Sequence, residues 1–301
     1  MKIVFSKYYT VKTPGHVFRA GKFEAALNML LKDGIVLKKD IVAPAAPSKA
    51  DLLLAHSPAW VKKNLKFGFT PEDSVKAELT ITRGVARAHM MNVGGTIKAA
   101  RLALKNGVGI NCGGGAHHAF KDHGEGFCLL NDIAIAVKKL LKERLIRRAM
   151  IIDLDAHQGN GTAAIFRGDK RVFTFSMHGV ETYPEKRERS SLDIELKAGT
   201  GDAVYLAVLK RGLSRVLDEF RPDLAVYLAG ADVYKGDALG GLGLTMLGIK
   251  KRDAFVFSEC RGRGVPVALT LGGGYALKPE NSAKIHAETI KSALSRHAGD
   301  L

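Results

Sequence analysis

Three side chains that can bind a metal ion follow one apolar run in this sequence. The segment IIDLDAHQGNG places Asp153, Asp155 and His157 two residues apart at the end of that run. Side chains at this spacing in an extended segment point to the same side, so the three can converge on one point. The pattern predicts a metal site at the end of a strand.

Three further apolar runs also lead into polar residues. GVGINC precedes GGGAHH with His117 and His118, LAVYLAG precedes Asp232, and VPVALTL precedes GGGY with Tyr275. In an open parallel α/β sheet, ligands bind beyond the carboxyl ends of the strands. We therefore expect loops that are distant in the sequence to build one active site.

Each cluster also has a structural interpretation. A single aspartate after a strand, such as Asp232, is more often a helix cap or a turn residue than a ligand. Three consecutive glycines before His117 are harder to explain structurally, because they cost backbone entropy and provide no side-chain packing. The four clusters together favour a functional site.

Apolar runs and amphipathic stretches alternate along the chain. We predict strands near residues 2–6, 108–112, 149–154, 171–176, 224–229 and 265–271. Between them lie stretches with apolar residues at helical spacing, such as FEAALNMLLK, GGTIKAARLALKN, NDIAIAVKKLLKERL and YLAVLKRGLSRVLDEF. This alternation predicts a parallel sheet with helices on both faces.

Length and composition indicate one large α/β domain over residues 1–301. The 301 residues are 46% apolar and 25% charged, and no change in composition marks a linker. The segment VAPAAPSKA at 42–50 is predicted to be a loop in which Ser48 caps the next helix.

No targeting or membrane segment is expected. No apolar run is long enough to span a bilayer, and MKIVFSKYYT has the character of a first strand. The three cysteines, Cys112, Cys128 and Cys260, are an odd number without a CxxC pair, which indicates a reducing compartment. We expect a cytoplasmic protein in which Cys112 is buried.

The chain resembles the zinc-dependent histone deacetylases and their bacterial relatives. The matching segments are GGGAHHAFKDHGEGFCLLNDIAIAV, IIDLDAHQGNG, AGADVYKGDALGGLGLT and LGGGYA, in the family's order and approximate spacing. Two N-terminal segments, GHVFRAGKFEAALNMLL and DLLLAHSPAWV, are similar as well, whereas DLDAHQGNG, KRDAFVF and RGRGVPV resemble the class IV branch. The resemblance implies an open eight-stranded parallel sheet.

The resemblance also implies a zinc-dependent hydrolysis of acyl-lysine amides. Asp155, His157 and Asp232 would give zinc three protein ligands and leave one position for water, as in catalytic zinc sites. Iron(II) suits the same ligands. The family's catalytic roles correspond to His117, His118, Asp153, Asn160 and Tyr275.

Within that set, His117 would pair with Asp153, and His118, the main proton carrier, with Asn160. Many class I relatives have an aspartate in place of Asn160. An amide orients an imidazole without stabilising imidazolium as a carboxylate does, so His118 should be less basic than in those relatives. Tyr275 would donate a hydrogen bond to the oxyanion.

Further residues correspond to the family's channel and its monovalent-cation site. The substrate channel would be lined by Gly126, Phe127, Tyr183, Gly273 and Gly274, with Cys128 close by. Potassium would be held by Asp153, Asp155, His157, Ser176 and Met177. Lys22 stands where many relatives have an arginine near an internal exit channel, and the rim aspartate of class I members has no clear equivalent.

Other functions remain open at this stage. Acetylated polyamines or other small amines are alternative substrates of the same site. Binuclear manganese ureohydrolases share the Asp-Ala-His element, but they need further carboxylates where this chain has Gly159 and Tyr234. A catalytically silent binding protein is the alternative of a different class.

The basic composition gives a further expectation about partners. The formal net charge is +16, and the Lys and Arg residues fall mostly on polar faces of predicted helices, which makes a nucleic-acid partner less favoured than a solvated basic surface. A positive field of this size is expected to disfavour polycationic substrates. The oligomeric state does not follow from the sequence.

Overall fold

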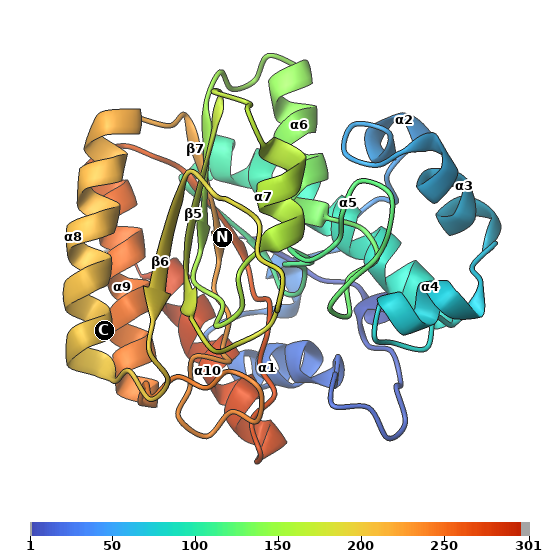
Figure 1. Cartoon of the computed structure of the whole chain (residues 1–301). Coiled ribbons are helices and arrows are strands. Elements are labelled where there is room, and N and C mark those ends of the chain that lie inside the picture. The colour runs from blue at the N-terminus through green and yellow to red at the C-terminus, as the bar shows by residue number, and fades with distance from the viewer. Residues whose placement is uncertain (1, 296–301) are drawn as a thin grey trace.

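One open sheet of eight parallel strands forms the centre of the structure, a computed structural model that describes residues 2–295 (Figure 1). The strand order is β2-β1-β3-β8-β7-β4-β5-β6, and every neighbouring pair is parallel. This confirms the predicted fold class. The strands are β1 (Ile3–Val4), β2 (Ile41–Val42), β3 (Val108–Asn111), β4 (Ala149–Asp153), β5 (Val172–Gly179), β6 (Leu192–Leu196), β7 (Leu224–Leu228) and β8 (Val267–Thr270).

Helices connect the strands and cover both faces of the sheet. Figure 1 shows α8, α9, α10 and α1 on one side and α5, α6 and α7 on the other. The α-helices are α1 (Gly21–Lys32), α2 (Lys49–Leu52), α3 (Pro58–Lys66), α4 (Pro71–Lys76), α5 (Arg83–Asn106), α6 (Asp132–Lys142), α7 (Asn160–Phe166), α8 (Asp202–Phe220), α9 (Met246–Gly262) and α10 (Pro279–Leu294). Short 3-10 helices, η1 (Lys7–Tyr9) and η2 (Lys38–Asp40), flank β1 and β2.

The central strands are buried on both faces. Along β4, Met150 and Ile152 pack into the core on the side of α8, α9 and α10, whereas Ala149 and Ile151 pack into the core on the side of α5 and α6. Alternate side chains of a strand point to opposite faces, so a strand covered on both sides must be apolar throughout. This is why the central strands appear in the sequence as continuous apolar runs.

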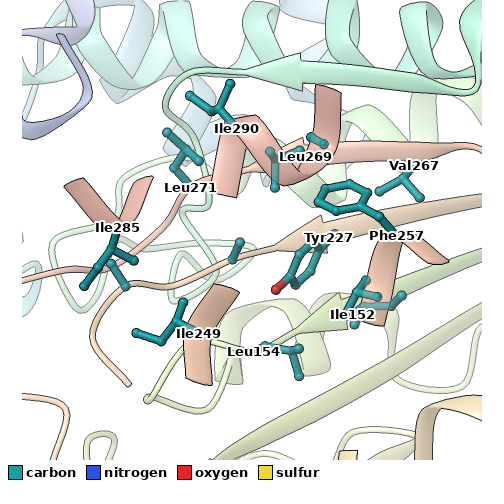
Figure 2. Close-up of a cluster of buried hydrophobic side chains, with 14 of the residues drawn as sticks. Ile152, Leu154, Tyr227, Ile249, Phe257, Val267, Leu269, Leu271, Ile285 and Ile290 are labelled. Carbon is teal, nitrogen blue, oxygen red and sulfur yellow. The ribbon is translucent and has the colours of Figure 1, made fainter. Parts of the chain in front are cut away.

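Figure 2 shows the first of these cores, in which side chains from three strands meet side chains from α9 and α10. Tyr227 of β7 lies against Phe257 of α9, with ring centroids 5.7 Å apart. This packing fixes α9 beneath the ends of β4 and β7, where the polar clusters begin.

Several boundaries differ from the sequence prediction. Two strands were not predicted from the pattern: β2 has only two residues, and β6 is a half-buried edge strand. The predicted strand 2–6 is shorter, because Ser6 already caps η1. Val42 belongs to β2, so the predicted loop 42–50 begins one residue later, while Ser48 caps α2 as expected.

The sequence argument about the metal segment is also partly wrong. The extended conformation of β4 ends at Asp153, and the chain then turns as the Asp155 N–H donates to Asp153 Oδ1 (3.1 Å) and the His157 N–H donates to Asp155 Oδ1 (3.1 Å). Alternation therefore does not carry all three side chains to one point. Across residues 2–295, none of the helices combines the length and the apolar character needed to cross a membrane.

Candidate active site

The ends of β4 and β7 bring two carboxylates and one imidazole together. His157 Nδ1 lies 3.0 Å from Asp155 Oδ1 and 3.2 Å from Asp232 Oδ2. One ligand atom from each of the three residues lies within 4.8 Å of the other two, and all three side chains are buried. Within the described residues this is the one group of its kind.

The donor set fits a divalent cation. Burial and the neighbouring Asp155 carboxylate raise the pKa of Asp232 to about 7, because two carboxylates share a site that water hardly reaches. A bound cation would remove that repulsion, and three protein ligands of oxygen and nitrogen leave a fourth position open, as in catalytic zinc sites. The carboxylates are held in place by backbone donors, since the Ala156 N–H donates to Asp232 Oδ1 (2.9 Å) and the Gly273 N–H to Asp155 Oδ2 (2.9 Å).

Two adjacent histidines, His117 and His118, follow β3 and lie beside the group formed by Asp155, His157 and Asp232. His117 Nδ1 lies 2.7 Å from Asp153 Oδ2, and His118 Nδ1 lies 2.8 Å from Asn160 Oδ1, which are the pairings that the resemblance implies. The centroids of the His117 and His118 rings lie 4.0 Å apart. Asp153 therefore faces His117 and lies outside the group of three ligand side chains.

The surroundings of the two histidines shift their pKa values in opposite directions. Burial disfavours imidazolium at His117, but the Asp153 carboxylate outweighs this effect and raises the pKa of His117 to about 9. Burial, together with the positive charge of His117, holds the pKa of His118 well below its usual value, and the amide of Asn160 offsets only part of this. His117 is set to carry a proton, and His118 is set to be neutral and to accept one.

Tyr275 completes the site from the loop after β8. Its ring lies edge-on to His157, with centroids 6.3 Å apart, and edge-on to Phe127 at 5.9 Å. Its backbone N–H donates to Asp237 Oδ2 at 2.6 Å. A cavity of about 340 Å³ is lined by the rings of Tyr275, His118 and His157 together, so one small molecule can reach all three.

Comparison with known proteins identifies the family to which this site belongs. The model of the histone deacetylase domain matches residues 16–292. The chain belongs to the histone deacetylase family. It is therefore a hydrolase of the deacetylase type, which acts on amide bonds.

Relatives of this deacetylase cover nearly its whole length. An uncharacterized protein of Picosynechococcus sp. is 41% identical, over 91% of this chain and 92% of that protein. Histone deacetylase 2 of Arabidopsis thaliana is 35% identical over 98% of this chain and 79% of the relative, and a probable deacetylase of Archaeoglobus fulgidus is 33% identical over 92% and 81%. The crystal structure of the HDA15 HD domain shares the fold, with a TM-score of 0.77 at 22% identity over 98% of this chain and 88% of that one.

Two of the loops that line the cavity in this deacetylase carry the aromatic side chains Phe127 and Tyr183. Tyr183 lies edge-on to the His118 ring, with centroids 4.9 Å apart and planes at 90°. Phe127 has φ +64°, and its backbone N–H donates to the Ala77 carbonyl at 2.8 Å. Gly126 has φ +50°, and a Cβ there would lie 2.5 Å from the His118 ring, so only glycine allows this approach. Cys128 is buried and lines a narrower pocket together with His118.

Gly273 lines the narrower pocket together with His118 and Cys128 and also supports the carboxylates, whereas Gly274 lines a neighbouring pocket with Lys22 and Tyr275. A Cβ on Gly273 would lie 1.8 Å from Asp232 Oδ2, so the backbone can support the carboxylates only without a side chain. The Gly274 carbonyl accepts a hydrogen bond from Lys22 Nζ at 3.1 Å. Lys22 is only 6% exposed and lies 4.8 Å from the centroid of the Tyr275 ring. Burial lowers the pKa of Lys22 to about 8.

The residues that resemble the monovalent-cation site lie around the ends of β4 and β5. Asp153 and Ser176 are register partners on these strands, and Met177 follows Ser176 in β5. Ser176 Oγ lies 2.9 Å from His178 Nδ1. Asp155 and His157 lie in the turn after β4, and the Ala156 carbonyl of that turn accepts a hydrogen bond from the Gly179 N–H at the end of β5 (3.0 Å).

Sequence reasoning missed several residues that support the site. Asp132 is fully buried and accepts hydrogen bonds from the N–H groups of Gly115 and Ala116, which fixes the loop before His117. Arg252 and Glu125 were missed as well. Arg252 Nη1 donates to the carbonyls of Leu154 and Gly230, and Glu125 accepts a hydrogen bond from Asn160.

The sequence shows Glu125 within GEGFC and Arg252 within KRDAFVF, but the spacing of these segments alone does not reveal the contacts.

Proposed function

We propose that this protein removes an acyl group from the amide of a primary amine, with acyl-lysine in a protein or peptide as the main substrate class. The observation that carries the proposal is the position of His118, whose ring lines one cavity together with His157 and Tyr275. A proton carrier, a ligand side chain and a hydroxyl donor can therefore act on one carbonyl group. Phe127 and Tyr183 line the same cavity, so we expect the acylated lysine side chain to enter between them.

We assign Asp155, His157 and Asp232 as the ligands of a single zinc ion, for which iron(II) is an alternative. When bound, such an ion lowers the pKa of water and polarises a carbonyl oxygen. A second divalent ion of the ureohydrolase kind would need carboxylates at Gly159 and Tyr234, which carry none.

Three side chains of the protein would carry out proton transfer and charge stabilisation during hydrolysis. His118, neutral and held through Nδ1, takes the proton of the attacking water at Nε2 and returns it to the leaving amine. His117, paired with Asp153, stays protonated and provides positive charge beside the reacting carbonyl. The Tyr275 hydroxyl donates a hydrogen bond to the developing oxyanion.

We further propose potassium as the ion held, largely through backbone carbonyls, by Asp153, Asp155, His157, Ser176 and Met177. The register pairing of Asp153 with Ser176, and the hydrogen bond from the Gly179 N–H to the Ala156 carbonyl, place β5 beside the turn after β4 and support the assignment. A cytoplasmic location is supported by the cysteines, since Cys112, Cys128 and Cys260 are all free and buried.

The test is an acyl-chain series on a single lysine peptide, with metal content measured on the same sample. We expect hydrolysis of at least one acyl-lysine, about one zinc or iron per chain, and loss of activity after chelation. An acetylated polyamine in the same assay tests the alternative amine class. Two manganese ions per chain with ureohydrolase activity, or no hydrolysis of any acyl amide, would overturn the proposal.

A further inference from the structure

Glu125 joins three polar side chains beside the catalytic site, and none of the roles assigned above uses it. It lies in the loop between β3 and α6, and its side chain is 21% exposed. Oε1 accepts a hydrogen bond from Asn160 Nδ2 at 2.6 Å, and Oε2 lies 3.4 Å from His123 Nε2. The Tyr183 side chain is a further polar neighbour of the carboxylate.

These contacts fix which way the Asn160 amide faces. Asn160 is 1% exposed, and its Oδ1 accepts a hydrogen bond from the Gly161 N–H at 2.9 Å. A carboxylate accepts and cannot donate, so the group facing Glu125 must be the NH2 of the amide. Glu125 and the Gly161 N–H thus act from two sides to turn Oδ1 towards His118.

The orientation of the amide then sets the tautomer of His118. An amide oxygen 2.8 Å from His118 Nδ1 requires that nitrogen to carry the hydrogen. Nε2 is left with its lone pair, which is the form that can accept a proton. If the amide were turned around, its NH2 would face Nδ1 and would favour the opposite tautomer.

The charge of Glu125 adds to this effect. Burial disfavours its ionised form, but hydrogen bonds from His123, Asn160 and Tyr183 outweigh burial and lower the pKa of Glu125. A charged acceptor makes the Asn160 contact stronger than a neutral one would, and it polarises the amide so that Oδ1 becomes a better acceptor.

We infer that Glu125 is a positioning residue that holds His118 in its proton-accepting tautomer through the amide of Asn160. The inference rests on the proposed function for its catalytic consequence. The tautomer itself can be observed without any reaction.

The direct test is the tautomer of His118 in nitrogen-15 NMR spectra of histidine-labelled holoprotein, with the signal assigned by its loss in His118→Ala. Wild-type protein should show His118 with hydrogen on Nδ1, whereas Glu125→Ala should show a mixture with hydrogen on Nε2. An unchanged tautomer in Glu125→Ala would overturn the inference, whatever the protein hydrolyses.

Kinetics on an acetyl-lysine peptide provide the second readout. Glu125→Gln keeps the size of the side chain and removes its charge, so we expect kcat to fall about tenfold, with metal content unchanged. Glu185→Gln is the control, because it removes an exposed carboxylate from the loop of Tyr183 and leaves the contacts of Asn160 and His123 with Glu125 in place, and we expect kcat within about twofold of wild type.

A double-mutant cycle separates positioning from general stabilisation. If Glu125 acts through the amide, Glu125→Gln should cause no further loss of kcat in an Asn160→Ala background. Full additivity of the two losses would overturn the role of Asn160 as intermediary. Absence of hydrolysis by wild-type protein would instead contradict the proposed function and leave the NMR result to decide the inference.

Discussion

Arg252 and Asp253, consecutive residues of α9, form an ion pair in which both side chains are completely buried, with Nε 2.8 Å from Oδ1. The pair extends in two directions. Arg252 Nη1 donates to the Leu154 carbonyl (3.1 Å) and the Gly230 carbonyl (2.8 Å), while Asp253 accepts hydrogen bonds from Tyr227 and Thr289. One charged pair therefore connects α9 and α10 to the two loops that carry the proposed metal ligands.

We predict that Arg252→Met lowers both stability and metal affinity. The substitution leaves Asp253 charged and buried without its partner, which typically costs about 3–5 kcal/mol in the free energy of unfolding. The two carbonyls also lose their donor, so the loops before Asp155 and Asp232 should bind metal less tightly. Denaturant unfolding and metal titration measure both effects. Lys251→Met, on the exposed side of the same helix, is the control and should change neither.

Asp155→Asn should abolish metal binding and hydrolysis while the fold remains. The large core on both faces of the sheet does not depend on this side chain, so the circular dichroism spectrum should be unchanged. Elemental analysis should give about one zinc or iron per chain for wild type and almost none for the variant. Retention of a full equivalent of metal by the variant would exclude Asp155 as a ligand.

Tyr275→Phe should lower kcat by about 100-fold to 1,000-fold, the usual cost of removing one oxyanion donor. KM and metal content should change little, because the ring contacts with Phe127 and His157 remain. Steady-state kinetics on an acetyl-lysine peptide measure the effect. Wild-type kcat in the variant would show that the hydroxyl takes no part in the reaction.

His56 should make the protein sensitive to mild acid. Its Nδ1 lies 2.9 Å from the Phe120 carbonyl, and its Nε2 accepts the Asn131 N–H at 3.0 Å, so the ring is neutral in the folded state. Burial lowers the pKa of His56 to about 4, below its ordinary value of 6.5. The unfolded chain therefore binds the proton first, and the stability contributed by this group is complete above pH 6.5 and is lost as the pH falls towards 4.

For this single group we expect a loss of about 2 kcal/mol in the free energy of unfolding between pH 7 and pH 5. His56→Gln cannot titrate in this range, so its stability, although lower at pH 7, should fall less over the same interval. Denaturant titrations at the two pH values give the comparison. Equal slopes for the two proteins would show that His56 titrates normally in the folded state.

The polar residues at the strand ends could be predicted to form a site, because each of them directly follows an apolar run that the sequence shows. The apolar runs of β3, β4, β7 and β8 are continuous, and the rule that ligands gather at the carboxyl ends of parallel strands then brings His118, Asp155, Asp232 and Tyr275 together. The open eight-stranded sheet followed from the family resemblance, since the pattern alone indicated six strands.

The supporting contacts could not be predicted, because they depend on where elements pack. Arg252 meets the Leu154 carbonyl across 98 positions of sequence, and in the sequence it belongs to an ordinary run of basic residues on a helix. Glu125 lies in a segment with the composition of a surface loop, and its contact with Asn160 depends on where α7 packs. The turn after Asp153 likewise arises from hydrogen bonds of its own side chain, which strand alternation ignores.

Charges at the active-site cavity should influence which substrates the protein prefers. A net charge of +16 suggests that polycations are disfavoured, yet the charged side chains besides histidine that line the 340 Å³ cavity are Glu78 and Glu181. At physiological salt, charges more than about 8 Å away are largely screened, so the nearest carboxylates should outweigh the distant lysines and arginines. We therefore expect an acetylated polyamine to be used at least as efficiently as an acidic acetyl-lysine peptide.

Substitution of both carboxylates should reverse that order. The double variant Glu78→Gln, Glu181→Gln should raise KM for the acetylated polyamine several-fold. It should leave kcat unchanged, since neither side chain is among the proposed metal ligands or the catalytic residues. High salt should reduce the difference in kcat/KM between the two substrates in wild type and should have little effect on it in the double variant. Glu185→Gln removes an exposed carboxylate from the same loop as Glu181 but outside the cavity, and it should behave as wild type. If wild type prefers the acidic peptide at low salt, the field of the whole protein dominates at the entrance, and the expectation from net charge is the correct one.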